Sequence, residues 1–327
     1  MSVAERKNSW YLFGTLLVLL GQASAQAESA SPEQQSICEI DCRETRADDV
    51  WLISTRHLGC ECLHKQEQDV DLRIKRSIGE DEWIDSTLDD FLNSQTADQP
   101  TLFYLHGNRV DACDAIRRGW DAYHGLFDCS KARPTRFVIW SWPSDKIKGQ
   151  VRDVRAKAVH TSGEAHYFAW LLGHLGNNSP ISIVGYSYGA RVTSGALHVL
   201  SGGELAGCTL PPGLQRPGGS MQVAFMAAAL HNNWLYANGC HELATSQIEH
   251  LLIQYNSKDP VLKRYHLIEK HGRPAALGYT GMYDDVSLAT LIEQSDVRSS
   301  VGKSHAEANY FRSDRVMEEA RQVLLDW

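Results

Sequence analysis

The sequence predicts an α/β fold in which a mostly parallel central sheet of about eight strands carries helices on both faces. Two observations support this prediction. Apolar, β-branched runs alternate with amphipathic helical patterns over about 250 residues. In addition, residues 101–105 form a continuous apolar run, as expected for a strand that is buried on both faces.

The first half of the domain contributes four expected strands. The second of them alternates apolar and basic residues, which suits a strand near a sheet edge with one solvated face. Residues 83–99 are acidic and polar, as in a solvated connection or a short helix. We expect these strands at residues 50–55, 72–78, 101–105 and 136–142, and helices at about 112–126, at 146–160 and after the capping-box pattern of Thr161 and Glu164.

The second half begins with a strand at residues 181–184 and a helix whose apolar face carries Val192, Ala196, Val199 and Leu200. Ligands of such sheets bind at the carboxyl ends of the strands, so the Gly- and Pro-rich loop 201–220, at the opposite end, is expected to be structural. Further strands are expected at 221–230 and 248–255, with weaker candidates at 276–282 and 291–297. An amphipathic helix with Val316, Ala320, Val323 and Leu324 closes the chain.

The motif Gly185-Tyr186-Ser187-Tyr188-Gly189 connects this strand to its helix. A tight turn at this place holds the central serine at its apex in a strained conformation, with the hydroxyl accessible. The two glycines lack the Cβ atoms that would clash where strand and helix pass closely. Ser187 is therefore the candidate nucleophile. A glycine-rich turn with a buried serine is the simpler alternative.

A serine hydroxyl needs a base to take its proton, and the base needs a group that orients it. Asp259 follows the expected strand at 248–255, which places it at the carboxyl-end rim of the sheet, and His305 lies in a loop before the last helix. The sequence thus offers nucleophile, acid and base in the order Ser187, Asp259, His305.

Other residues compete for the last two roles. His231 also lies on the predicted rim, and Asp284, Asp285 and Asp296 are alternative acids. Asp259, which Pro260 follows, also has the sequence of a simple helix start. These alternatives stay open at the level of the sequence.

In this order of residues the chain resembles the α/β-hydrolase superfamily, in its serine esterase and lipase branch, and especially bacterial members with a His-Gly-Asn loop. The resemblance covers residues 50–327. It implies that Ser187 is the nucleophile, His305 the general base and Asp259 the acid that orients the imidazole.

The resemblance also implies an oxyanion hole made by the backbone N–H groups of Tyr188 and Asn108. Asn108 departs from the Gly or apolar residue that is common at its position. His106, which precedes it by two residues, is expected to be buried and hydrogen-bonded, and to shape the loop rather than to act in catalysis.

Aromatic residues in the rim loops are candidates for an apolar substrate pocket. They are Trp142, Trp234 and Tyr236, together with Leu235. Packing of these side chains against the domain is the alternative. The insertion at residues 231–247 stands where relatives carry lids or caps, and it is too short for a large cap domain.

Residues 1–27 have the layout of a secretory signal peptide: Arg6 and Lys7, an apolar core, then small residues with cleavage after Ala25 or Ala27. We therefore expect a secreted or periplasmic protein, with a cysteine-containing extension at 28–49 and the α/β-hydrolase domain at 50–327. The apolar core is shorter than a membrane span of about twenty residues. An uncleaved anchor is the alternative, and membrane contact is expected only in that case.

Eight cysteines follow the signal segment, and an even number in an exported chain favours disulfides. Two bridges among Cys38, Cys42, Cys60 and Cys62 are expected; a metal site with His57 and His64 is the alternative. We expect no metal and no other cofactor. The sides of the predicted sheet suggest the pairs Cys113–Cys240 and Cys129–Cys208.

The charge of the chain argues against one class of binding partner. The 327 residues have 32 Lys and Arg against 40 Asp and Glu, a net charge of −8, and no basic block, so we expect no nucleic-acid partner. The expected activity is cleavage of a small-molecule carboxylic ester through an acyl-enzyme. An amidase or thioesterase with the same triad, or a non-catalytic binding protein of this fold, are the alternatives. The sequence does not indicate an oligomeric state.

Overall fold

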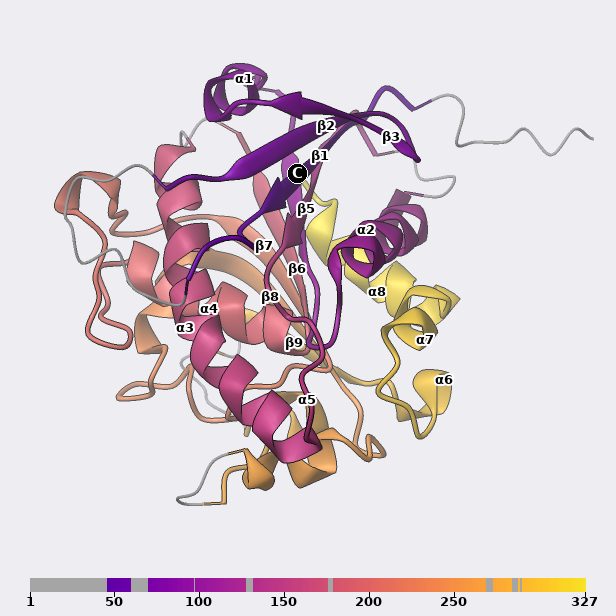
Figure 1. Ribbon diagram of the computed structural model, residues 1–327. Coiled ribbons are helices and arrows are strands. Elements are labelled where there is room, and N and C mark those ends of the chain that lie inside the picture. The colour runs from indigo at the N-terminus through magenta and orange to yellow at the C-terminus, as the bar shows by residue number, and fades with distance from the viewer. Residues whose placement is uncertain are drawn as a thin grey trace, which may run out of the picture. The chain divides into compact units, whose positions relative to one another are not determined.

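The computed structural model describes residues 46–59, 70–96, 98–127, 132–175, 179–268, 273–283, 288 and 290–327, all within one unit of residues 42–327. Within these ranges nine strands form one sheet, in the order β3-β2-β1-β5-β4-β6-β7-β8-β9 (Figure 1). Only β2 runs against the others, since it pairs antiparallel with β1 and β3. The predicted α/β class with a mostly parallel sheet is confirmed.

Residues 82–86 form a strand, β3, that was not predicted, since residues 83–99 were expected to be a connection or a short helix. The other strands lie close to their predicted positions, and β4 to β7 are buried along their whole length. Such apolar runs are typical of parallel strands covered on both faces. The strands are β1 Asp49–Ser54, β2 Arg73–Gly79, β3 Glu82–Ser86, β4 Thr101–Leu105, β5 Arg136–Ser141, β6 Ile181–Tyr186, β7 Met221–Met226, β8 Ile248–Tyr255 and β9 Ile292–Asp296.

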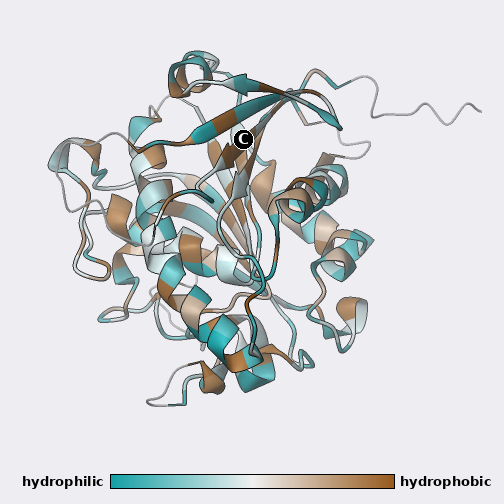
Figure 2. Ribbon diagram, in the orientation of Figure 1, coloured by the Kyte–Doolittle hydropathy of each residue, from teal (hydrophilic) through white to brown (hydrophobic). Residues whose placement is uncertain are grey.

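Helices α3 and α4 cover one face of the sheet, and α2 and α8 cover the other (Figure 1). The polar residues gather along β2, β3 and the outer turns of α3 (Figure 2). The helices are α1 Leu88–Asn93, α2 Ala112–Phe127, α3 Gln150–His174, α4 Tyr188–Leu200, α5 Leu277–Thr280, α6 Arg298–Val301, α7 Glu307–Phe311 and α8 Asp314–Leu324, with 3₁₀ turns η2 Pro212–Leu214, η3 Glu242–Gln247 and η4 Leu262–Leu267.

The predicted helix start at Thr161 and Glu164 is wrong, because α3 runs through both residues without a break. The Thr161 hydroxyl donates to the carbonyl of Ala158 inside the helix, at 2.7 Å. Glu164 is buried and accepts a hydrogen bond of 2.7 Å from the Thr55 hydroxyl. Neither side chain therefore caps a helix: Thr161 bonds to the backbone inside α3, and Glu164 makes a tertiary contact. A capping box does start α1, within residues 83–99, between Thr87 and Asp90.

Two strand predictions also need correction. The predicted strand at 276–282 is wrong, because Leu277–Thr280 form the short helix α5 and Ala276 keeps only a single bridge, to His231. A Cβ on Gly278 would lie 2.2 Å from the backbone nitrogen of Ala228, so this turn packs directly on the chain that follows β7. The predicted strand at 221–230 ends at Met226, because Ala227 turns the backbone with a φ of 48°.

The predicted Cys113–Cys240 disulfide is absent, since Cys113 is a free, exposed cysteine. Cys113 lies in α2, on one face of the sheet, whereas Cys240 directly precedes η3, which packs on α4 over the other face. Cys208 is disulfide-bonded, but Cys129 lies outside the described residues, so the Cys129–Cys208 pair stays a prediction. Cys38, Cys42, Cys60, Cys62 and His64 lie outside them as well.

The described residues hold no group of three metal-ligating side chains, and His57 contacts Asp71 at 3.2 Å. None of the helices in this part of the chain is long and apolar enough to cross a membrane. The expected signal peptide at 1–27 lies outside the described residues.

Candidate active site

The turn between β6 and α4 holds Ser187 in a strained conformation, with φ 52° and ψ −112°. Hydrogen bonds fix it on both sides: its N–H donates to the Met226 carbonyl at 2.9 Å, and its carbonyl accepts from Ala229 at 3.0 Å. A Cβ on Gly189 would lie 2.0 Å from the Leu105 carbonyl oxygen. One on Gly185 would lie 2.7 Å from the Cα of Ala190. Both glycines are therefore required by close packing of the backbone.

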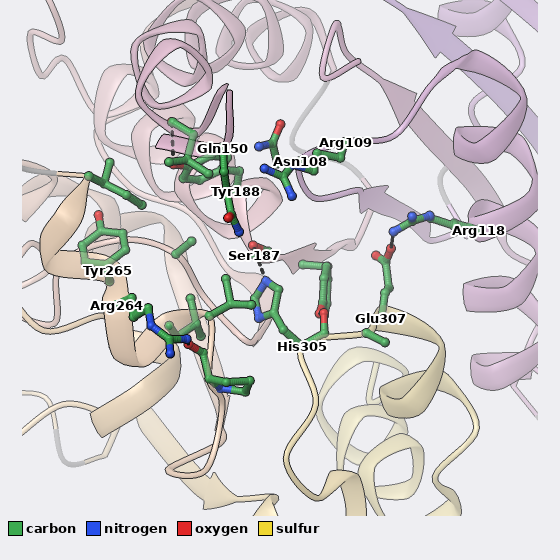
Figure 3. Close-up of a pocket in the computed structure, with 18 of the residues that line it drawn as sticks. Asn108, Arg109, Arg118, Gln150, Ser187, Tyr188, Arg264, Tyr265, His305 and Glu307 are labelled. Carbon is green, nitrogen blue, oxygen red and sulfur yellow. Dashed lines mark hydrogen bonds and ion pairs between the residues drawn. The ribbon is translucent and has the colours of Figure 1, made fainter. Parts of the chain in front are cut away.

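Three residues that are far apart in the sequence meet at this turn. Ser187 Oγ lies 3.1 Å from His305 Nε2 (Figure 3). On the other side of the ring, His305 Nδ1 lies 2.6 Å from Asp259 Oδ2. The Asp259 side chain is fully buried, while 18 % of the His305 side chain is exposed. The arrangement is that of a hydroxyl, a base and an orienting carboxylate.

The two carboxylate oxygens of Asp259 have separate partners. Oδ2 faces His305, and Oδ1 accepts from the backbone N–H groups of Val261 and Leu262, at 2.8 and 3.0 Å. The helix-start interpretation and the acid interpretation of Asp259 are thus compatible, because each uses a different oxygen. The hydrogen bonds to Oδ1 also fix the direction in which Oδ2 points.

The loop that carries His305 is held by side chains from several strands. The Tyr186 hydroxyl donates to the His305 carbonyl at 2.7 Å. The Asn256 amide, just after β8, donates to the carbonyls of Gly302 and Ser304, at 2.9 and 3.2 Å. The imidazole therefore stands on a loop that is fixed at both of its sides.

Glu307 anchors the other end of this loop, and the sequence analysis did not identify it. Its buried carboxylate accepts from the Tyr104 hydroxyl at 2.7 Å and pairs with Arg118 at 2.8 Å. Burial raises the pKa of Glu307, while the Arg118 guanidinium opposes that rise. No local pattern marks Glu307, because its partners lie in β4 and α2, about 190 to 200 residues earlier.

The loop after β4 passes beside Ser187. A Cβ on Gly107 would lie 3.2 Å from the Ser187 Cβ, so the backbone of this loop is within reach of the hydroxyl. Asn108 Nδ2 donates to Asp153 Oδ2 at 3.3 Å, and Arg109, with a φ of 60°, pairs with the same carboxylate. The fully buried Asp153 of α3 thus fixes the two residues that follow Gly107.

His106 is buried and hydrogen-bonded, as predicted. Its Nε2 accepts from the backbone N–H of Trp142 at 3.2 Å, and its Nδ1 donates to the Gly107 carbonyl at 2.9 Å. Burial, helped by the Arg56 guanidinium, lowers the pKa of His106 to about 3. The residue shapes the loop and does not contact Ser187.

The competing residues have other partners. His231 stacks on Trp234, with ring centroids 4.5 Å apart, and Ser187 Oγ faces His305 instead. Asp296 accepts from the Ser257 hydroxyl at 2.7 Å and from the backbone N–H of Arg298 at 3.1 Å. Asp284 and Asp285 lie outside the described residues.

Ser187 and His305 open into a cavity of about 570 Å³. Its apolar wall comes from the start of α3 and from η4: Val151, Val154, Leu262, Tyr265, Leu267 and Ile268. Asn108 and Tyr188 also line the cavity, and Tyr188 starts α4, where backbone N–H groups lie outside the helical ladder. The cavity therefore combines the candidate nucleophile, two residues with candidate oxyanion donors and an apolar wall.

The predicted pocket residues do not line this cavity. Trp142 is fully buried and donates its indole N–H to the His106 carbonyl at 2.8 Å, so this prediction is wrong. Trp234 packs against His231 and under the Arg191 guanidinium, and the Tyr236 hydroxyl donates to the Tyr283 carbonyl. Leu235 is buried. The aromatic loop residues pack against the domain.

The comparison with known proteins found no matching family model and no matching curated protein. Two solved structures of inhibited esterase B from Lactobacillus rhamnosis are similar to this chain, one inhibited by a C6-C4 SN3 compound and one by a C4-C4 SN3 tributyrin phosphonate. The first is 11 % identical with a TM-score of 0.38, over 86 % of this chain and 90 % of that one. The second is 10 % identical with a TM-score of 0.35, over 85 % and 87 %.

Structural similarities with TM-scores of 0.38 and 0.35 carry no weight in the assignment of the fold. That assignment depends on the order of the strands and on the turn that follows β6, which places Ser187 at the wall of a cavity at the carboxyl end of a mostly parallel sheet. On these features the chain has the α/β-hydrolase fold.

Proposed function

We propose that this chain is a serine hydrolase that cleaves a small-molecule carboxylic ester through an acyl-enzyme on Ser187. The observation that carries the proposal is the chain of contacts from Ser187 Oγ through His305 to Asp259, at 3.1 and 2.6 Å, at the wall of an apolar cavity. A merely structural serine needs neither the strained turn nor the buried carboxylate behind the histidine.

In the proposed reaction, His305 Nε2 takes the proton of Ser187 as Oγ attacks the carbonyl carbon of the ester. Asp259 keeps the other imidazole nitrogen protonated and stabilises the imidazolium that forms. His305 then gives the proton to the leaving alcohol, and a water molecule repeats the sequence to release the acid. His305 is the base in both halves, whereas the nucleophile is Ser187 in the first half and water in the second, where Ser187 Oγ leaves and regains its proton from His305.

The negative charge of the tetrahedral intermediate needs fixed donors. We propose the backbone N–H groups of Tyr188 and Asn108, because these residues line the cavity next to Ser187. Each such donor is worth about 3 kcal/mol of the activation barrier. The buried Asp153 supports this role by holding the side chain of Asn108.

The first test measures turnover of p-nitrophenyl butyrate by the wild type and by Ser187→Ala. We expect the variant to lose at least about 10³-fold in kcat and to keep the wild-type circular dichroism and Tm. A fluorophosphonate probe should label the wild type at Ser187 only. Turnover that survives in the variant would exclude Ser187 as the nucleophile.

The same measurement separates the alternatives. A butyryl oxygen ester, thioester and anilide present one acyl group on three leaving groups, so their kcat/KM values rank the bonds directly. A non-catalytic binding protein of this fold would give no turnover with any of them and no labelling at Ser187.

We also propose that the chain is exported, on the basis of the signal-peptide pattern of residues 1–27. The mature protein should then begin after Ala25 or Ala27. Amino-terminal sequencing of the protein from the extracellular or periplasmic fraction tests this proposal. An intact Met1 would contradict cleavage.

A further inference from the structure

Four arginines of the described residues line the cavity, and three of them are already paired with carboxylates. Arg109 pairs with Asp153, Arg118 with Glu307 at 2.8 Å, and Arg117 with Asp114 and Asp121 at 2.9 and 3.3 Å. Their charges are compensated locally. The fourth is Arg264.

Arg264 has no carboxylate partner among the described residues. One nitrogen of its guanidinium donates to the Pro260 carbonyl at 2.8 Å, and the side chain is exposed at the cavity wall. The other four of its five N–H donors are not used by that carbonyl, and a guanidinium presents such donors in the fork that suits an oxyanion. In a chain with a net charge of −8, this uncompensated cation is a local feature of the cavity.

The position of Arg264 is fixed by the turn that also carries the candidate acid. Asp259 Oδ1 accepts from Val261 and Leu262, and the N–H of Arg264 donates to the Val261 carbonyl at 3.0 Å. Arg264 and Tyr265 lie on one side of Ser187 and His305, and the Arg118–Glu307 pair lies on the other (Figure 3). Within the part of the chain that the structure describes, a substrate on Ser187 therefore meets a cation without a carboxylate partner on the Arg264 side of the cavity only.

Beside Arg264, the other η4 residues that line the cavity are Leu262, Tyr265 and Leu267. Leu262 and Tyr265 are 3 % and 1 % exposed, and they continue the cavity wall toward Ile268 and Val154. An occupant of this side of the cavity thus contacts an apolar surface along its length and a guanidinium at its edge. That combination suits an apolar chain that carries an anionic group.

We propose that Arg264 determines specificity, and that the substrate is an ester with an apolar chain and a carboxylate or another oxyanion on that chain. This inference depends on the proposed ester hydrolysis for its meaning, but binding of the anion can be measured without turnover. The apolar chain of the substrate, with its anionic group, belongs to either the acyl or the alcohol half of the ester.

The kinetic test compares esters that differ only in charge. Mono-p-nitrophenyl adipate, with the carboxylate on the acyl half, is compared with p-nitrophenyl hexanoate. Sodium 4-butyryloxybenzoate, with the carboxylate on the alcohol half, is compared with phenyl butyrate. We expect the wild type to favour one anionic ester over its neutral partner by about 10- to 100-fold in kcat/KM, as for a hydrogen bond to a charged group.

Arg264→Gln should abolish this preference and leave kcat/KM for the neutral ester within about twofold. Arg264→Lys should retain part of it. Lys263→Gln is the matched control, because it removes the same charge from the adjacent exposed residue, outside the cavity wall. A preference that is absent from the wild type, or that survives Arg264→Gln, or that Lys263→Gln removes equally, overturns the proposal.

A binding measurement separates this inference from the proposed function. In the Ser187→Ala protein, calorimetric titration with octanoate and octanamide compares an anion with its neutral isostere. We expect octanoate to bind at least tenfold more tightly, and Arg264→Gln to equalise the two. Equal binding before that substitution overturns the anion site, whereas an absence of fluorophosphonate labelling in the wild type overturns only the hydrolase.

Discussion

Asp259 is the residue whose two functions are best separated by the structure. Because Oδ1 binds two backbone N–H groups and Oδ2 faces His305, an amide can keep the first set of contacts and lose the second. Asp259→Asn should therefore lower kcat for p-nitrophenyl butyrate by about 10³- to 10⁴-fold, since the imidazole then takes the wrong tautomer. The Tm should change by less than about 2 °C. An activity within tenfold of the wild type would show that another acid orients His305.

Asp153 is a positioning residue for the loop that contains Asn108. It lies in α3, is fully buried, and accepts from Asn108, Arg109 and the backbone N–H of Ile147. We expect Asp153→Asn to lower kcat by about 10- to 100-fold through displacement of the oxyanion donor, with a smaller change in KM. Steady-state kinetics measures the changes in kcat and in KM separately. A change confined to KM would place Asp153 outside the proposed oxyanion hole.

At the scale of elements, the turn between β6 and α4 tolerates no side chain at Gly189, where a Cβ would lie 2.0 Å from a backbone oxygen of β4. Gly189→Ala should push α4 away from β4 and lower the Tm by several degrees, because overpacking costs about 1–3 kcal/mol or more. The rate of fluorophosphonate labelling at Ser187 should also be lower in Gly189→Ala than in the wild type. Gly213→Ala in η2 is the matched control, since its Cβ would meet no atom within 4 Å. Equal effects of the two substitutions would contradict this account.

The same elements show what the sequence could predict. The carboxyl ends of β6 and β8 bring Ser187 and Asp259 to one rim, so the order of strands and turns was enough to find both. Glu307 was missed because its partners are distant in sequence, and Arg264 because its lack of a carboxylate partner within the described residues is visible only in three dimensions. The aromatic loop residues were misassigned: aromatic size favours burial as much as ligand contact, and Trp142 is fully buried.

At the scale of the whole molecule, Arg56 connects the end of β1 to the loops at the rim of the sheet. It donates to the Ser141 hydroxyl at 2.7 Å, to Asp145 at 2.8 Å and to the Val110 carbonyl at 3.0 Å. Two buried titratable groups, Glu164 and His106, lie near this guanidinium. Burial raises the pKa of Glu164 to about 8 and lowers the pKa of His106 to about 3.

These two shifts have opposite consequences for stability. Glu164 has a higher pKa in the folded chain than its ordinary value of 4.5, so its contribution to stability is complete below pH 4.5 and is lost as the pH rises toward about 8. His106 has a lower pKa than its ordinary 6.5, so its contribution is complete above pH 6.5 and is lost as the pH falls toward about 3. The sum of the two contributions to stability is therefore largest between pH 4.5 and pH 6.5, the ordinary pKa values of the two groups.

Glu164→Gln isolates the first of these effects. An amide oxygen can still accept from the Thr55 hydroxyl, and it has no proton to lose at high pH. The Tm of the variant should therefore be close to that of the wild type at pH 5 and exceed it by at least about 3 °C at pH 8.5. Differential scanning calorimetry at several pH values measures the difference, and circular dichroism at pH 7 controls for the fold. Two Tm curves that stay parallel from pH 5 to pH 8.5 would mean that Glu164 is ionised in the folded chain, paired with the nearby Arg56 instead of neutral beside Thr55.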